Sequence, residues 1–164
     1  DMLKRAAEKL TNMNVNNWKT IVADLKAKLP IDNESADIVL AGWSICYIAS
    51  ANVSGWKQNV EKLFDEIKRI LRPDGKVVIF ETMGTGTEQP SPPDFLCPYF
   101  EWLETHCKLE KRIIRTDFLF DSVEQAAQLC GDFFGESLRN KIRETNSAIV
   151  PSCTGVWFGN VAKP

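Results

Sequence analysis

Three side chains of this sequence carry groups that transfer protons in enzymes, but none of them stands in a complete catalytic motif. Glu81 ends the apolar run "VVIFET", where a carboxylate could act as a general base, bind a polar group, or be a solvated residue at a strand end. His106 is the single histidine, and nothing in the sequence pairs with it, so a structural or exposed histidine is the alternative. Tyr99, in an aromatic segment, is the third candidate.

The cysteines form neither a metal-binding nor a disulfide pattern. The chain has five of them, an odd number, and no pair has the spacing CxxC. Cys97, His106 and Cys107 lie close in sequence but match no zinc spacing, so we expect buried or idle thiols and no bound metal. Reduced thiols are typical of intracellular proteins, and we expect a cytoplasmic one.

The length and composition predict one soluble globular domain over residues 1–164, because 44% of the residues are hydrophobic and 26% are charged. A net charge of −2 provides no cationic field for nucleic acid. The longest apolar run, "ADIVLAGWSICYIASA", is too short for a membrane span. We therefore expect a small-molecule substrate, and neither a nucleic acid nor a membrane as partner.

The elements that must position these side chains alternate between helix and strand. Apolar residues recur at helical spacing over residues 2–10 and again over 57–71. Residues 18–24, "WKTIVAD", predict a short strand, and 36–43, "ADIVLAGW", predict a strand buried on both faces. Residues 77–82 predict another buried strand. This order is typical of an α/β fold with a parallel sheet.

The second half begins with a long loop rich in Gly and Pro, "MGTGTEQPSPPDF", and continues with an aromatic helical segment. We expect residues 83–110 to form a loop and helix on the substrate side, since long loops in compact domains are usually functional or mobile. Four aromatic residues could line a lid, although an aromatic stripe at helical spacing is also typical of a core. They are Phe95, Tyr99, Phe100 and Trp102.

The remaining elements are predicted from local signals. Residues 110–120 resemble a strand, and the pairs Asp121–Glu124 and Ser122–Gln125 are N-terminal capping patterns for a helix. A further helix is expected over 136–145, and "TGVWFGNV" predicts a last strand.

Four motifs, in this order, resemble the middle of class I S-adenosylmethionine-dependent methyltransferases, of the methyltransferase type 11 kind. They are "DL" at 24–25, "LP" at 29–30, "SADIV" at 35–39 and "RILRPDG" at 69–75. The tail "IRTDFLFDSVEQAAQLCGDFFG" looks like the last strands of such a domain, so the resemblance covers nearly the whole chain. It implies a Rossmann-like three-layer sandwich and S-adenosylmethionine as methyl donor.

The resemblance also implies cofactor-binding residues. Asp24 would lie at the adenine amino group and Leu25 would offer its backbone N–H to the ring; a carboxylate that only caps a turn is the alternative for Asp24. Ala41, Gly42 and Trp43 would face the methionine moiety, where a small residue lets the backbone approach closely. Trp43 could pack beside the sulfonium or be a core tryptophan. Weaker candidates for the pocket wall are Ser44, Cys46 and Tyr47.

The helix of residues 2–10 resembles the one that follows the family's second strand, so the chain corresponds to the C-terminal two-thirds of the domain. The first strands of the sheet and the glycine-rich cofactor loop would then be missing, and an open sheet edge favours a homodimer or a strand-swapped assembly. We expect methyl transfer to a small-molecule acceptor, with poor cofactor binding by this chain alone. The alternative is a non-catalytic, methyltransferase-like interaction or regulatory module.

Overall fold

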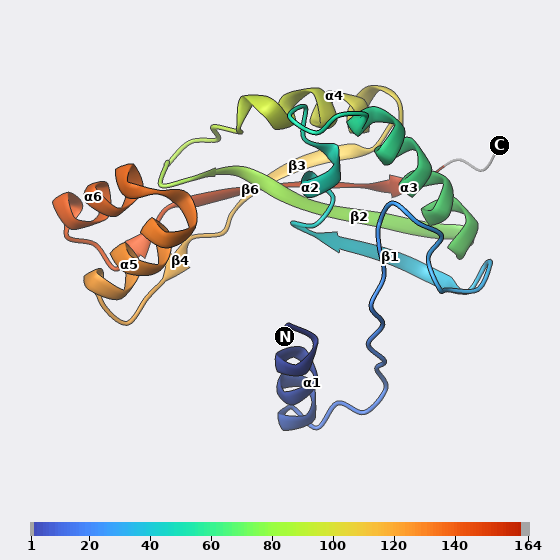
Figure 1. The fold of residues 1–164 in the computed structure, drawn as a ribbon, viewed down its shortest axis with the longest axis horizontal. Coiled ribbons are helices and arrows are strands. Elements are labelled where there is room, and N and C mark those ends of the chain that lie inside the picture. The colour runs from blue at the N-terminus through green and yellow to red at the C-terminus, as the bar shows by residue number, and fades with distance from the viewer. Residues whose placement is uncertain (1, 162–164) are drawn as a thin grey trace.

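The computed structural model describes residues 2–161 and is built around a mixed four-stranded sheet (Figure 1). The strand order is β1 (Ala36–Gly42), β2 (Leu71–Thr85), β6 (Ser152–Asn160) and β3 (Glu110–Arg115). β1 and β2 are parallel, whereas β6 is antiparallel to both of its neighbours. The carboxyl ends of β1 and β2 therefore meet at one edge of the sheet. The predicted α/β class is confirmed, with one antiparallel strand added.

Three helices cover one face of this sheet: α2 (Cys46–Ala49), α3 (Trp56–Ile70) and α4 (Cys97–Thr105) (Figure 1). The predicted apolar stripe of α3 is fully buried; its members are Val60, Leu63, Phe64, Ile67 and Ile70. Alternate residues of β2 face these helices, because side chains alternate along a strand. The main core lies between this strand and these helices.

The aromatic residues of segment 95–102 divide between core and surface. Tyr99, Phe100 and Trp102 are buried, so the core interpretation holds for these three. Phe100 stacks on Trp157 at 4.6 Å between ring centroids. Phe95, in the 3-10 turn η1 (Asp94–Leu96), is 44% exposed and remains available as a lid residue.

A second, smaller cluster forms at the end of the sheet, from α5 (Val123–Phe134), α6 (Glu136–Thr145) and the short pair β4 (Phe118–Leu119) and β5 (Ile149–Val150) (Figure 1). Its core residues are Ala126, Ala127, Cys130, Ile142 and Val150. The predicted cap is confirmed, because the Ser122 hydroxyl accepts a hydrogen bond from the Gln125 N–H. The Gln125 side chain in turn accepts one from the Asp121 N–H.

The amino-terminal segment does not pack as predicted. Helix α1 (Met2–Asn12) forms, but none of its residues is buried, and it stands apart from the sheet (Figure 1). The strand predicted over residues 18–24 is wrong: this stretch is irregular and largely exposed. A strand is stable only when its N–H and C=O groups pair with a neighbour, and the described residues offer none here.

β1 forms as predicted, but the expectation that both of its faces are buried is wrong. Ile38 and Leu40 are 62% and 65% exposed, whereas Val39 and Ala41 pack against the main core. The alternation arises because, within residues 2–161, the packed helices cover only one face of the sheet.

No helix in this described part of the chain is long and apolar enough to cross a membrane.

The "RPDG" segment produces an irregularity in the ladder rather than a free turn. Ala36 pairs with Leu71 and Ile38 pairs with Lys76, so residues 72–75 bulge out of β2. Arg69, on α3, connects this helix to the loop that precedes β1. It donates hydrogen bonds to the Glu66 carboxylate and to the carbonyl oxygens of residues 29 and 31.

Candidate functional site

A cavity of about 870 Å³ opens at the carboxyl end of β2, beside the start of α2. Parallel α/β sheets bind ligands at this edge, because the loops that leave the strands diverge there. Three segments form its walls: the start of α2, residues 82–96, and the region where α5 meets α6. Its lining includes the side chains of Cys46, Tyr47, Thr82, Phe95, Leu138 and Lys141.

Glu81 lies directly behind this cavity, on the face of β2 that packs against the helices. Its side chain is completely buried, so the interpretation of Glu81 as a solvated strand-end residue is wrong. One carboxylate oxygen, Oε1, accepts a hydrogen bond of 3.0 Å from the backbone N–H of Cys46. The other, Oε2, has no hydrogen-bond partner among the described residues. The neighbouring residue Thr82 points to the opposite face and lines the cavity.

Burial controls the acid–base properties of this group. Loss of hydration raises the pKa of the Glu81 carboxyl to about 7, although hydrogen bonds from Cys46 and Ile45 oppose the shift. Burial also raises the pKa of the Cys46 thiol to about 12, and the nearby Glu81 charge adds to this effect. A thiol with so high a pKa is a poor nucleophile at neutral pH.

Of the two other acid–base candidates, the structure brings only Tyr99 close to Glu81. Burial raises the pKa of the Tyr99 hydroxyl well above its ordinary value, with the Glu81 charge as a further cause, and this hydroxyl has no hydrogen-bond partner among the described residues. His106 is exposed and stacks on Trp102 at the far end of α4. The structure does not bring His106 to this cavity.

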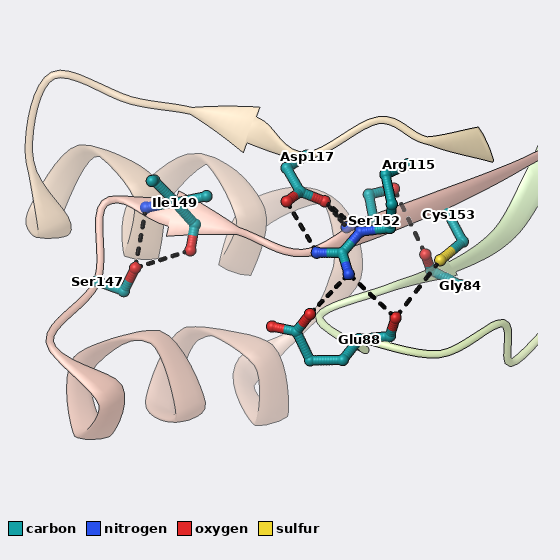
Figure 2. A network of polar contacts seen from close by, with 8 residues as sticks. All are labelled: Gly84, Glu88, Arg115, Asp117, Ser147, Ile149, Ser152 and Cys153. Carbon is teal, nitrogen blue, oxygen red and sulfur yellow. Dashed lines mark hydrogen bonds and ion pairs between the residues drawn. The ribbon is translucent and has the colours of Figure 1, made fainter.

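The loop after β2 is held by a polar network that is drawn in Figure 2. The Arg115 guanidinium bridges the carboxylates of Glu88 and Asp117 at 2.7 and 2.8 Å. Asp117 also accepts a hydrogen bond from the Ser152 N–H at 3.0 Å (Figure 2). The end of β3, the loop and the start of β6 are thereby fixed to one another.

On its other side the loop is tied to α6. The Lys141 ammonium group donates a 2.6 Å hydrogen bond to the Gly86 carbonyl oxygen. Gly86, Leu138 and Lys141 also line a second cavity of about 450 Å³, between this loop, α6 and β5. These three residues therefore form the wall between the two cavities, which we call the partition.

Asp24 and Leu25 lie on a turn and not at a strand end. The Asp24 carboxylate is exposed and accepts a 2.9 Å hydrogen bond from the Lys26 N–H, as the turn-capping alternative describes. Leu25 is half-buried against the main core. Neither residue lines the cavity beside Glu81.

Ala41 and Gly42 end β1 at the predicted edge and Trp43 follows them, but none of the three lines the cavity beside Glu81. A Cβ placed on Gly42 would meet no atom within 4 Å, so the backbone there is open. Trp43 is 50% exposed and its ring lies 6.0 Å from that of Phe80, so the core alternative for Trp43 is wrong. Trp43 therefore presents an aromatic face beside an open backbone, and such a face can attract a cation.

Several lining residues could not be found in the sequence. Leu138 and Lys141 come from α6, which belongs to a different cluster and carries no motif. The Gly- and Pro-rich loop over residues 83–95 was a usable signal and does form a wall of the cavity. Of the three weaker candidates for the pocket wall, Cys46 and Tyr47 line the cavity and Ser44 does not. All five cysteines carry free thiols. Within residues 2–161, no three His, Cys, Asp or Glu side chains gather as a metal site would require.

Comparison with known proteins adds independent information. Residues 1–79 match the family model described as "methyltransferase domain". A stretch of 78 residues is 31% identical to sterol 4-C-methyltransferase strm-1 of Caenorhabditis elegans. This stretch is 48% of the chain but only 21% of the nematode enzyme.

Solved structures match over nearly the whole chain. A SAM dependent methyltransferase from Aquifex aeolicus matches with a TM-score of 0.52 and 14% identity, over 96% of this chain and 62% of that one. The YcgJ protein from Bacillus subtilis matches with a TM-score of 0.54 and 14% identity, over 96% of this chain and 76% of that one. At such low identity these likenesses concern the fold.

Proposed function

We propose that this chain transfers a methyl group from S-adenosylmethionine to a small-molecule acceptor, because residues 1–79 match the methyltransferase domain family and the chain has the Rossmann-like fold of class I methyltransferases. The observation that carries the proposal is the cavity of about 870 Å³ at the carboxyl end of β2. It lies at the edge where parallel sheets bind ligands.

Methyl transfer makes modest demands on side chains, since S-adenosylmethionine supplies a methyl group that is already activated. The protein has to orient the acceptor and exclude water, and orientation alone accelerates such reactions strongly. Ala41, Gly42 and Trp43 would hold the methionine end, with the Trp43 ring beside the sulfonium. Asp24 and Leu25 would hold the adenine if their turn reached it.

The lining of the cavity favours an acceptor with an apolar body that also carries hydroxyl groups. Tyr47, Phe95 and Leu138 supply apolar surface, while Thr82 is one of six Ser and Thr residues in the lining. The lining holds one cationic side chain, Lys141, and one carboxylate, Asp94, so it offers no net charge to an acceptor of high negative charge. A sterol, the substrate class in the name of the nematode relative, has this make-up.

The cofactor part is tested by titrating the 164-residue chain with S-adenosylmethionine and, separately, with S-adenosylhomocysteine in a calorimeter. Only the first ligand carries a positive sulfonium. Trp43→Leu should therefore weaken binding of S-adenosylmethionine roughly three- to tenfold more than binding of S-adenosylhomocysteine. Phe133→Leu is the matched control, because Phe133 is an exposed aromatic residue on α5 and not at the end of β1.

Equal losses for both ligands would contradict the role of Trp43. Failure of the folded wild-type chain to bind either ligand would contradict the proposal for this chain. The acceptor part is tested with labelled S-adenosylmethionine and a panel of sterols. Transfer to a highly anionic molecule in place of a sterol would overturn the proposed acceptor class.

A second candidate is a non-catalytic module that assembles with another copy of itself. The exposed apolar side chains of Ile38 and Leu40 on β1 favour it, as does the unpacked stripe of α1 with Met2 85% exposed. Light scattering during size-exclusion chromatography separates the two cases when it is combined with the calorimetric titration. A dimer that binds neither ligand supports the module, whereas a monomer that binds both supports the enzyme.

A further inference from the structure

Glu81 places a carboxyl group in otherwise apolar surroundings. The residues that share its face of β2 are apolar, namely Val77, Ile79 and Met83. Its Oε2 atom is buried without a hydrogen-bond partner among the described residues. Burying a carboxyl group that is only half satisfied costs free energy, so an apolar residue would serve the core better.

The hydrogen bonds that Glu81 accepts come from Ile45 and Cys46, at the start of α2, and so lead to the cavity. Oε1 accepts from the Cys46 N–H at 3.0 Å, and Cys46 and Tyr47 both line the cavity. They begin α2, a helix of four residues whose N-cap, Ile45, makes no side-chain hydrogen bond. So short a helix has little stability of its own.

We propose that Glu81 is a positioning residue, which fixes the Cys46–Tyr47 wall of the cavity through its hydrogen bond to the Cys46 N–H. Strand β2 is held firmly here, because it pairs with β6 at Glu81 itself and with β1 up to Phe80. The carboxylate thus fixes α2, a short and weakly held helix, to the sheet. The proposal rests on the proposed function only in taking the cavity as the acceptor site.

The groups that face Glu81 from the packed elements are the Cys46 thiol of α2 and the Tyr99 hydroxyl of α4. No cationic side chain is among the causes of the shifted pKa of Glu81, which burial raises to about 7. The ionised carboxylate is the stronger acceptor. The wall should therefore be held more firmly above neutral pH than below it.

Amide hydrogen exchange of the peptide that spans residues 44–50 tests the hydrogen bond. Glu81→Gln keeps an acceptor oxygen, so we expect its exchange rate to lie within about threefold of wild type. Glu81→Leu removes the acceptor, so we expect exchange at least tenfold faster in this peptide, with exchange in α3 unchanged. Met83→Leu, at the next inward position of β2, is the matched control and should leave this peptide unchanged. Should Glu81→Leu fail to fold, Glu81→Asp retracts the acceptor by one methylene and gives the same test.

Alkylation of Cys46 by iodoacetamide reports the charge of Glu81, because Glu81→Gln removes the charge and keeps an acceptor oxygen. The Glu81 charge raises the pKa of Cys46 but not that of Cys107, although burial raises both to about 12. At pH 9 we expect Cys46 to react several-fold faster in Glu81→Gln than in wild type, and faster still in Glu81→Leu. Cys107 should react at one rate in all three proteins.

Exchange in Glu81→Leu, or in Glu81→Asp, that matches wild type would overturn the proposal. Equal Cys46 alkylation in wild type and Glu81→Gln would overturn the ionised carboxylate as the form that holds the wall. Neither measurement uses S-adenosylmethionine or an acceptor. Failure of the methyl-transfer proposal would therefore leave this result intact, and the reverse also holds.

Discussion

The ammonium group of Lys141 donates a hydrogen bond to the carbonyl oxygen of Gly86 at 2.6 Å, and this contact joins α6 to the loop that follows β2. The two residues are 55 positions apart in the sequence. Both line the cavity at the carboxyl edge of the sheet and also the smaller cavity behind it. The shape of the candidate site thus depends on a contact between the main sheet and the α5–α6 cluster.

Replacement of Lys141 by Met should loosen this partition. A hydrogen bond from a charged but exposed donor contributes about 1 kcal/mol, so we expect a loss of this size in the free energy of unfolding by urea. Lys62→Met is the control, since Lys62 is an exposed lysine on α3. A loss no larger than that of the control would show that the contact does not hold the partition.

Gly86→Ala should destabilise the same region by a steric and a conformational route. Gly86 has a φ of 79°, which residues with a side chain rarely adopt, and an added Cβ would overlap the Leu138 side chain. We expect a loss of about 1–3 kcal/mol in thermal or urea unfolding. In the double variant Gly86→Ala, Leu138→Ala, only the steric part of this loss in stability should be recovered. Gly42→Ala, at an open position, should change stability by less than about 0.5 kcal/mol.

Glu66 should make stability depend on pH in the acid range. The hydrogen bonds and charge of Arg69 lower the pKa of the Glu66 carboxyl from 4.5 to about 2. The unfolded chain therefore binds more protons between these values, and the stabilisation is complete above about pH 5 and lost as the pH falls towards 2. Glu66→Gln should cost stability at pH 6, and its difference from wild type should shrink on acidification. Glu61→Gln, an exposed control on α3, should show no such trend.

Glu81 should give a pH dependence of the opposite sign. Burial raises its folded-state pKa from 4.5 to about 7, so between these values the folded chain binds more protons than the unfolded chain. Stability then falls as the pH rises from 4.5 to 7, by on the order of 3 kcal/mol. In Glu81→Gln this fall should be absent, which urea unfolding at several pH values would show. An equal fall in wild type and variant would contradict the assignment.

The sequence alone determined the elements whose signals are local. The apolar stripe of α3, the Ser122 cap of α5 and the buried run of β2 all depend on residues within a few positions of each other. The motifs around "RILRPDG" also led to the methyltransferase family, because their order and spacing are properties of the chain itself. The same apolar run predicted Glu81 as the end of a strand, whereas β2 continues past it to Thr85.

Tertiary structure decided what depends on a neighbour. Residues 18–24 have the composition of a strand but remain irregular, because no described strand pairs with them. Leu40 is as apolar as a core residue, yet it is exposed because no described helix packs on its face of the sheet. Burial likewise set the pKa of Glu81, and contact between α6 and the loop brought Lys141 to Gly86. Pairing, burial and long-range contact depend on groups that are distant in the sequence, so the local pattern could not specify them.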